Sequence, residues 1–319
     1  MESRFETIRN NIYRKYNDDY LRKILIDFQG QQLNTQNFSV ENRNISKILN
    51  HFFDDLILSS KSKNGKYSPE EVINNDDLLK IALEYIEYHK NFYQQKSDVA
   101  NLRDFFFSSS MVGKVSNFNP VIARKIYERY VPFDDAVIFD YSCGFGSRML
   151  GALSSKYKYS YVGCEPYDEL YQRLLIFRNW IASTLCNESS ATIYNLGSEI
   201  FIPDLIGKVD LSFSSPPYFN YETYTECETQ SYIRYPEYDE WLNNFVVETV
   251  KNIYMYTKDD GLHLVNLEDT RRIKLIQDWI EIASKIGFSL ENIEEINVRK
   301  RETNKNNGKL LVFKKKDFN

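Results

Sequence analysis

An alternation of short apolar segments with helical ones, from about residue 115 onward, constrains the fold of this chain more than any other feature. Apolar runs that predict buried strands lie at 136–141, 159–165, 191–197, 209–215 and 261–268. Helices are predicted at 120–130, 148–154, 168–184, 237–256 and 271–286, and two last strands near 288–298 and 309–315. Because parallel strands need crossover connections, the alternation predicts an α/β fold with a doubly wound, Rossmann-like sheet covered by helices on both faces.

The first third of the chain differs in character from the rest. It contains two glycines, and apolar residues recur at helical spacing over 21–28, 45–56 and 78–86. The segment 60–71 contains an Asn-Gly pair and a proline, so a loop is expected there. We therefore expect a helical N-terminal region, 1–112, followed by an α/β domain, 113–319.

Composition excludes several classes of protein. Apolar runs fall short of the roughly 18 residues that a membrane span needs, and the N-terminus carries no apolar signal segment. Four cysteines without a CxxC pair and three histidines make a metal site unexpected. We expect free thiols and a cytoplasmic location. The net charge of −5 weakens a nucleic-acid partner without excluding one, since a local basic patch suffices.

A glycine turn follows the first strand of the predicted sheet, which ends at Asp140. The turn contains Ser142, Gly144, Phe145 and Gly146. Glycines let the backbone turn tightly there and approach a ligand. A dinucleotide fingerprint needs a third glycine where this chain has Met149, which argues against NAD. Glu165 ends the next strand about 20 residues later, where nucleotide-binding sheets place an acidic residue on the ribose hydroxyls.

The fourth strand runs directly into the segment Ser215-Pro216-Pro217-Tyr218. Proline cannot donate a ladder hydrogen bond and fixes φ, so the double proline ends the strand and makes a rigid loop at its carboxyl end. Sheets of this kind bind ligands at that edge. The loop presents the Ser215 hydroxyl, backbone carbonyls and the Tyr218 ring, and we expect it to be catalytic.

These motifs, in this order, resemble those of the amino-methyltransferases that modify adenine N6 or cytosine N4 in DNA. That class has a strand–Asp–x–Phe–x–Gly–x–Gly motif and an Asp/Asn/Ser-Pro-Pro-Tyr/Phe motif, which correspond here to Asp140–Gly146 and Ser215–Tyr218. Tyr-Ser-Cys stands where the class more often has Pro-Phe-x. The stretches GFGSRMLGAL and SSPPYFNYETY are similar to a subset found in phages and mobile elements. The resemblance covers roughly 115–315, and restriction-modification, phage self-protection and regulation are all open as settings.

The resemblance implies a methyltransferase sheet that is mostly parallel with an antiparallel last strand, and S-adenosylmethionine as cofactor. It implies cofactor contacts from Asp140, Ser142, Gly144, Phe145, Gly146, Glu165, Pro166, Glu199, Phe118 and Pro120. It assigns catalysis to Ser215, Pro216, Pro217 and Tyr218. The Ser215 hydroxyl and the Pro216 carbonyl would accept hydrogen bonds from the exocyclic NH2 group, and Tyr218 would stack on a flipped-out base. Substrate contacts are expected from Phe219, Asn220, Tyr221, Glu222, Tyr224 and Arg234.

Two other functions stay open beside DNA methylation. RNA base methyltransferases use similar loops, and the chain could instead be a cofactor-binding subunit whose activity depends on a partner. The motif order leaves no room for a recognition domain between the glycine turn and the catalytic loop. Target recognition is therefore expected from 1–112, from the loop 219–236, or from a partner, either another protein or a second copy. A basic cluster at 299–309 is a further candidate for phosphate contacts.

Overall fold

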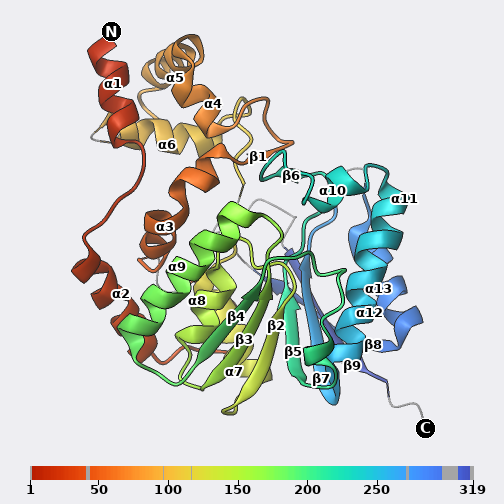
Figure 1. Ribbon diagram of the computed structural model, residues 1–319. Coiled ribbons are helices and arrows are strands. Elements are labelled where there is room, and N and C mark those ends of the chain that lie inside the picture. Colours follow the sequence, from red (N-terminus) through yellow and green to blue (C-terminus); the bar gives the residue numbers. More distant parts are fainter. Residues whose placement is uncertain are drawn as a thin grey trace. The chain divides into compact units, whose positions relative to one another are not determined.

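The computed structural model describes residues 2–40, 44–95, 97–115, 117–270, 273–296 and 308–316. The chain divides into two compact units, each with its own core (Figure 1). The helical unit comprises Met1–Asn17, Asn50–Ser116 and Asn220–Glu226. The sheet unit comprises Asp18–Leu49, Asn117–Phe219 and Cys227–Asn319.

The sheet unit is built on a seven-stranded sheet, counted over the described residues, in the order β4-β3-β2-β5-β7-β9-β8. Its strands are β2 (Ala136–Asp140), β3 (Tyr159–Cys164), β4 (Ser190–Tyr194), β5 (Val209–Ser214), β7 (Thr257–Leu267), β8 (Phe288–Ile296) and β9 (Gly308–Lys315). Strand β9 lies antiparallel between β7 and β8, while the ladders from β4 to β7 are parallel. The predicted fold class, a doubly wound α/β sheet with an antiparallel last strand, is confirmed.

Two groups of helices cover this sheet, and side-chain alternation along β2 assigns them to opposite faces. Phe139 belongs to the apolar cluster that includes residues of α12 (Val247–Tyr256) and α13 (Leu275–Ile286). The other group consists of α7 (Pro120–Tyr130), α8 (Ser147–Leu153) and α9 (Asp168–Leu185), which follow one another in contact (Figure 1). The expected helix over 237–256 is interrupted: α11 (Tyr238–Trp241) leads through a π-helical turn, Leu242–Val246, into α12.

A buried cation joins α2 (Asp18–Gly30) to the sheet unit. Arg124 of α7 is fully buried, pairs with Glu128 at 2.6 Å, and donates hydrogen bonds to the carbonyl oxygens of Phe28, Gln29 and Gln31. These carbonyls belong to the last turn of α2 and the residue after it, where backbone acceptors lack partners within the helix. The expected boundary near residue 112 therefore does not match the compact units, because helical periodicity does not say which neighbour a helix packs against.

The helical unit contains α1 (Glu2–Asn11), α4 (Pro69–Asn74), α5 (Asp76–Tyr88), α6 (Asp98–Ser108) and the short strands β1 (Lys61–Ser62) and β6 (Glu222–Thr223). Helix α3 (Ser46–Ser59) belongs to both units, divided at Asn50. The segment expected as a loop at 60–71 instead begins with β1, which pairs antiparallel with β6, and ends in α4, whose Ser68–Glu71 capping box fixes its start. Within the described chain, each helix is too short or too polar to cross a bilayer.

Candidate active site at the carboxyl edge of the sheet

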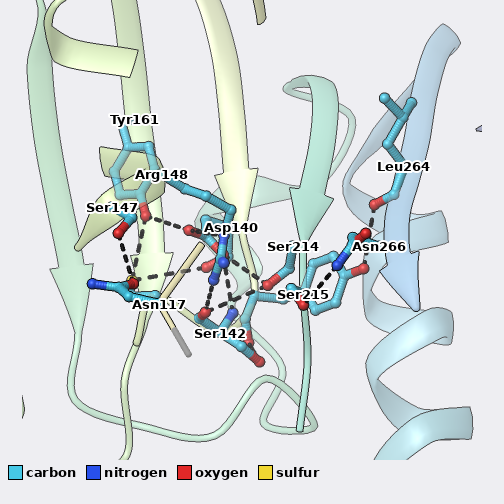
Figure 2. A network of polar contacts seen from close by, with 12 residues as sticks. Asn117, Asp140, Ser142, Ser147, Arg148, Tyr161, Ser214, Ser215, Leu264 and Asn266 are labelled. Carbon is cyan, nitrogen blue, oxygen red and sulfur yellow. Dashed lines mark hydrogen bonds and ion pairs between the residues drawn. The ribbon is translucent and has the colours of Figure 1, made fainter. Parts of the chain in front are cut away.

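A buried carboxylate organises the carboxyl edge of the sheet. Asp140, the last residue of β2, is fully buried and accepts hydrogen bonds from Arg148 Nε (2.9 Å), Tyr161 Oη (2.6 Å) and Ser214 Oγ (2.8 Å) (Figure 2). The Ser142 backbone N–H adds a longer bond of 3.3 Å. Charge-assisted bonds of this kind are strong, so Asp140 ties β3, β5 and the glycine turn together. Its carboxylate is occupied by protein donors, and its expected contact with the cofactor stays a prediction.

Arg148 is the cation of this network, and the sequence analysis did not select it. It lies buried in α8, donates to the Ser142 carbonyl as well as to Asp140, and its guanidinium carbon lies 5.7 Å from the centroid of the Phe118 ring. Burial, the largest single effect, lowers the pKa of Arg148, but the charge and hydrogen bond of Asp140 together with the neighbouring Tyr161 and Tyr127 outweigh burial and raise the pKa. The signal for Arg148 in the sequence is a charged residue directly before the apolar run Met149–Leu153.

The glycine turn has the backbone geometry that its sequence predicted. Gly144 and Gly146 have φ of +52° and +70°, in the left-handed region that favours glycine. A Cβ atom on Gly146 would lie 2.9 Å from Leu174 Cδ2, so this glycine allows α9 to pack closely. A Cβ atom on Gly144 would meet nothing within 4 Å. Open space therefore faces the turn at Gly144, whereas the Phe145 side chain beside it is buried.

Glu165 follows β3 directly and lies beside this turn. Its side chain is buried, with the residue 6% exposed, and Oε1 accepts the backbone N–H of Tyr167 at 3.0 Å. Burial raises the pKa of Glu165 to about 8, although hydrogen bonds from the backbones of Tyr167 and Gly144 lower it in part. The adjacent Pro166 is half-buried. A carboxyl group with this pKa gains or loses its proton near neutral pH, so a ligand with hydroxyl donors can shift its protonation.

Glu199 and Arg234 form an ion pair with each other. The sequence motifs predict a cofactor contact for Glu199 and a substrate contact for Arg234. The Glu199 side chain is 4% exposed, and its oxygens accept no hydrogen bond within the described residues. Arg234 closes α10 (Ser231–Arg234), in the connection that follows the catalytic loop. The pair therefore joins the end of β4 to this connection.

The segment before α7 contacts the Asp140 network rather than standing apart from it. Asn117 Oδ1 accepts a hydrogen bond from Ser147 Oγ at 2.6 Å, and the Phe118 ring lies 5.5 Å, edge to face, from Phe213 of β5. Asn119 caps α7 through a 2.9 Å bond from the Val121 backbone N–H. Pro120 is buried as the first helical residue, and its carbonyl lies against Gly151 of α8. Phe118 is thus next to the site, and Pro120 packs between helices.

Strand β5 brings the loop Ser215–Tyr218, which is predicted to be catalytic, to the same edge, as Figure 2 shows. Ser215 directly follows Ser214, whose hydroxyl donates a hydrogen bond to Asp140. The loop therefore begins next to a residue of the glycine-turn network. Ser215 Oγ lies 3.2 Å from Tyr218 Oη and 3.2 Å from Asn266 Nδ2 of β7. Pro216 is buried, and Pro217 and Tyr218 are half-buried. Asn266 escaped the sequence analysis; its signal is a polar residue in the run GLHLVNLE.

Phe219 is not free to contact a substrate, which corrects one expectation. Its side chain is buried, with ring centroids 5.4 Å from Tyr238 and 5.6 Å from Trp241. Its φ is +55°, an uncommon value for a bulky residue that costs free energy. Packing of the ring therefore holds a strained backbone directly after the Ser215–Tyr218 loop.

The residues after Phe219 belong to the helical unit. The set comprises Asn220, Tyr221, Glu222 and Tyr224. The Tyr221 carbonyl accepts a 2.9 Å bond from the Lys63 backbone N–H, Asn64 donates to the Tyr221 hydroxyl, and Tyr224 donates to Glu222. The structure thus distributes the expected substrate-binding set over both units. The basic cluster expected at 299–309 lies almost wholly outside the described residues.

A serine–histidine pair, Ser212 of β5 and His263 of β7, lies in the core and is not a catalytic centre. Ser212 Oγ lies 2.9 Å from His263 Nδ1, and Trp279 Nε1 donates to His263 Nε2 at 3.1 Å. All lie in the core, and burial lowers the pKa of His263 to about 3, so the ring is neutral and both nitrogens are engaged. Over the described residues, no cluster of three or more His, Cys, Asp or Glu side chains could hold a metal ion.

The chain is similar to several solved structures, at low sequence identity. No family model and no curated protein matches the chain. A TehB-like SAM-dependent methyltransferase from Corynebacterium glutamicum is 16% identical, covering 75% of this chain and 100% of its own, with a TM-score of 0.40. A SAM-dependent methyltransferase from Methanosarcina mazei is 13% identical, covering 60% and 96%, with a TM-score of 0.42. The [4+2]-cyclase SpnF is 11% identical, covering 61% and 81%, with a TM-score of 0.44. Likenesses this distant assign no activity, so function must be argued from the site.

Proposed function

We propose that this chain transfers a methyl group from S-adenosylmethionine to the exocyclic amino group of a nucleic-acid base, in DNA at cytosine N4 or adenine N6. The observation that carries the proposal is the position of Ser215. The SPPY loop leaves β5 one residue after Ser214, which is hydrogen-bonded to Asp140 at the start of the glycine turn. An aspartate at a strand end, a glycine turn and a Pro-Pro-Tyr loop, in this order along the chain, also define the amino-methyltransferases that the sequence resembles.

The residues at the edge fit the cofactor. Gly144 leaves open space beside a left-handed turn, where the backbone can approach a ligand. Glu165, buried next to it, offers a carboxyl group to ribose hydroxyls. The bound cofactor supplies a methyl group on a positively charged sulfur. Asp140 and Arg148 hold the turn in shape from behind, and their charges cancel locally.

The chemical task of the protein is positioning. An exocyclic amine is a poor nucleophile because its lone pair is delocalised into the ring. Ser215 Oγ and the Pro216 carbonyl would accept hydrogen bonds from the NH2 group, which favours a tetrahedral nitrogen with an available lone pair. Catalysis then rests on orientation and fixed dipoles. Once the nitrogen has accepted the methyl group, it would give up one proton to the solvent.

A radiolabel assay tests the proposal. The full chain, given cofactor with a tritiated methyl group, is incubated separately with duplex DNA, single-stranded DNA and tRNA. We expect label in DNA. Label in RNA alone would assign the chain to RNA base methyltransferases, and cofactor binding without label in any nucleic acid would favour the partner-dependent subunit. The resemblance to methyltransferases of phages and mobile elements makes a bacterium or a phage-infected cell the proposed setting.

The matched variants are Ser215→Ala and Ser212→Ala, two serines of the same strand segment. Removing the Ser215 hydroxyl should lower the methyl-transfer rate by about 10²–10³-fold, the usual loss for one preorganised polar group, and leave cofactor affinity unchanged. Ser212 bonds His263 in the core, so Ser212→Ala should cost about 1–3 kcal/mol of unfolding free energy and spare the rate. Equal rates in the two variants would remove Ser215 from the mechanism.

A further inference from the structure

Asn266 lies beside the catalytic loop and contacts both of its hydroxyl groups. Strands β5 and β7 pair in parallel with Ser214 opposite Val265, so Ser215 and Asn266 follow at adjacent positions. Asn266 is 7% exposed, and its Nδ2 donates to Ser215 Oγ at 3.2 Å and to Tyr218 Oη at 3.3 Å (Figure 2). Pairing with Leu310 of β9 holds the Asn266 backbone in place. The Asn266 residue is therefore held by its backbone in β7 and by its side chain at the loop.

The hydrogens of this cluster can be assigned by counting donors and acceptors. An amide nitrogen only donates, whereas a hydroxyl has one hydrogen and two acceptor lone pairs. Tyr218 Oη donates to the backbone carbonyl oxygen of Asn266 at 3.3 Å, which commits the phenol hydrogen. The bond between Ser215 Oγ and Tyr218 Oη must then be donated by Ser215. Ser215 Oγ accepts from Asn266 with one lone pair and keeps the other for a ligand.

The orientation of the Asn266 amide decides this outcome. With Nδ2 toward the hydroxyls, the ligand-facing lone pair of Ser215 is an acceptor. With Oδ1 toward them, both hydroxyl groups would donate to Oδ1. The Ser215 hydrogen would then no longer bond Tyr218 Oη. Oδ1 has no hydrogen-bond partner among the described residues, and a Cβ atom on Gly308 would lie 2.8 Å from it. Glycine at 308 therefore leaves room for the Asn266 amide group.

We propose that Asn266 is a positioning residue that holds Ser215 as a hydrogen-bond acceptor and so makes the site select bases with an exocyclic amino group over bases with a carbonyl in its place. The inference rests on the proposed function. The N–H of an amino base can donate to the remaining Ser215 lone pair. A carbonyl oxygen in its place is a second acceptor, so no hydrogen bond forms and the two oxygens repel each other. Sites that hydrogen-bond one polar group reject an analogue that cannot, because their own polar groups are left unpaired.

The test exchanges the donor for an acceptor of the same shape. Asn266→Asp imitates the reversed amide when ionised, and the protonated carboxyl group can donate again. At pH 8 we expect kcat to fall at least about tenfold with the cofactor Kd unchanged. Lowering the pH to 6 should restore part of the loss relative to wild type. Asn187→Asp is the control, because Asn187 donates in the same way to a carbonyl, that of Leu153, away from the site.

Binding measurements separate this inference from the proposed function. Single-stranded oligonucleotides with cytosine or uracil, and with adenine or hypoxanthine, at one position are titrated into protein saturated with the demethylated cofactor. Wild type should prefer the amino base of a pair, and Asn266→Asp at pH 8 should lose that preference. Tyr218→Phe, which frees the Ser215 hydrogen, should weaken it as well, and serves if Asn266→Asp fails to fold. Retained preference in these variants would overturn the role of Asn266; preference in a wild type that transfers no methyl group would overturn only the proposed function.

Discussion

Each compact unit contains a buried arginine–aspartate pair, and the two pairs do different work. In the helical unit, Arg103 of α6 binds both carboxylate oxygens of Asp54 at 2.6 and 2.8 Å and donates to the Ile12 carbonyl at 2.7 Å. Asp54 also accepts the backbone N–H of Arg14 at 2.9 Å. The partners of this pair are helices and the chain that leaves α1. It fastens α1, α3 and α6 together.

The pair in the sheet unit, Arg148–Asp140, has partners of another kind. Its additional donors, Tyr161 and Ser214, come from the strands on either side of β2, and Arg148 also binds the glycine turn. Burial and charge are nearly the same in the two pairs. The difference is that one joins helices, while the other shapes an edge with open space in front of it. A buried ion pair by itself therefore indicates no function; its neighbours do.

The largest expected effect comes from Asp140→Asn. It leaves Arg148 as an unpaired buried charge and sets an amide against two hydroxyl donors, so we expect a loss of about 3–5 kcal/mol of unfolding free energy. Because the glycine turn depends on the same network, cofactor affinity should fall at least about tenfold. Urea denaturation measures the first and calorimetric titration the second.

Asp54→Asn is the matched change in the helical unit. It should cost a similar free energy of unfolding, because it also leaves an arginine without its counter-charge. Cofactor affinity of the folded protein should stay within about twofold of wild type, since all the proposed cofactor contacts belong to the sheet unit. Equal losses of affinity in the two variants would end the distinction between the pairs.

The next effect concerns Glu165, whose pKa is raised to about 8 from 4.5 by burial. Ribose hydroxyls bond best to the charged carboxylate, so binding should release a proton, and cofactor affinity should rise about tenfold between pH 6 and 8.5. Glu165→Gln should bind more weakly and flatten this dependence. Titration in buffers of different ionisation enthalpy detects the proton. A wild-type affinity independent of pH would contradict the role of Glu165.

The same pKa makes a prediction for the ligand-free protein. A folded pKa above the unfolded one gives a stabilising contribution that is complete below pH 4.5 and is lost as the pH rises through about 8. Glu165→Gln should therefore gain stability relative to wild type as the pH is raised over this window. Thermal melts at pH 5 and pH 8.5 measure the difference, and a constant difference would argue against a protonated Glu165.

The smallest effect compares two glycines with positive φ and open surroundings, Gly144 and Gly207. Alanine at either position should cost about 1–2 kcal/mol, the strain of a left-handed alanine. Only Gly144→Ala places a methyl group in the space proposed for the cofactor, so only it should weaken cofactor binding, by about fivefold. Equal binding by the two variants would place the cofactor elsewhere.

Much of the sheet unit could be predicted from local patterns. The helix at 120–130 was placed at its observed bounds, because Pro120 marks the start and apolar spacing marks the rest. Strand ends at Asp140 and Ser214 were predicted within one residue, since a glycine turn and a double proline follow them. These signals act through neighbouring residues, through backbone freedom at glycine and its restriction at proline, and they need no knowledge of distant contacts.

The sequence by itself thus determined the strand–helix order, the glycine turn and the loop that ends β5. The tertiary structure alone decided that α2 joins the sheet unit through Arg124, that Asn220–Glu226 joins the helical unit, and that Arg148 and Asn266 stand behind the site. The physical reason is distance along the chain. Hydrogen bonds such as Ser214–Asp140 and Asn266–Ser215 join residues 74 and 51 positions apart, and only the packed sheet brings their atoms within reach.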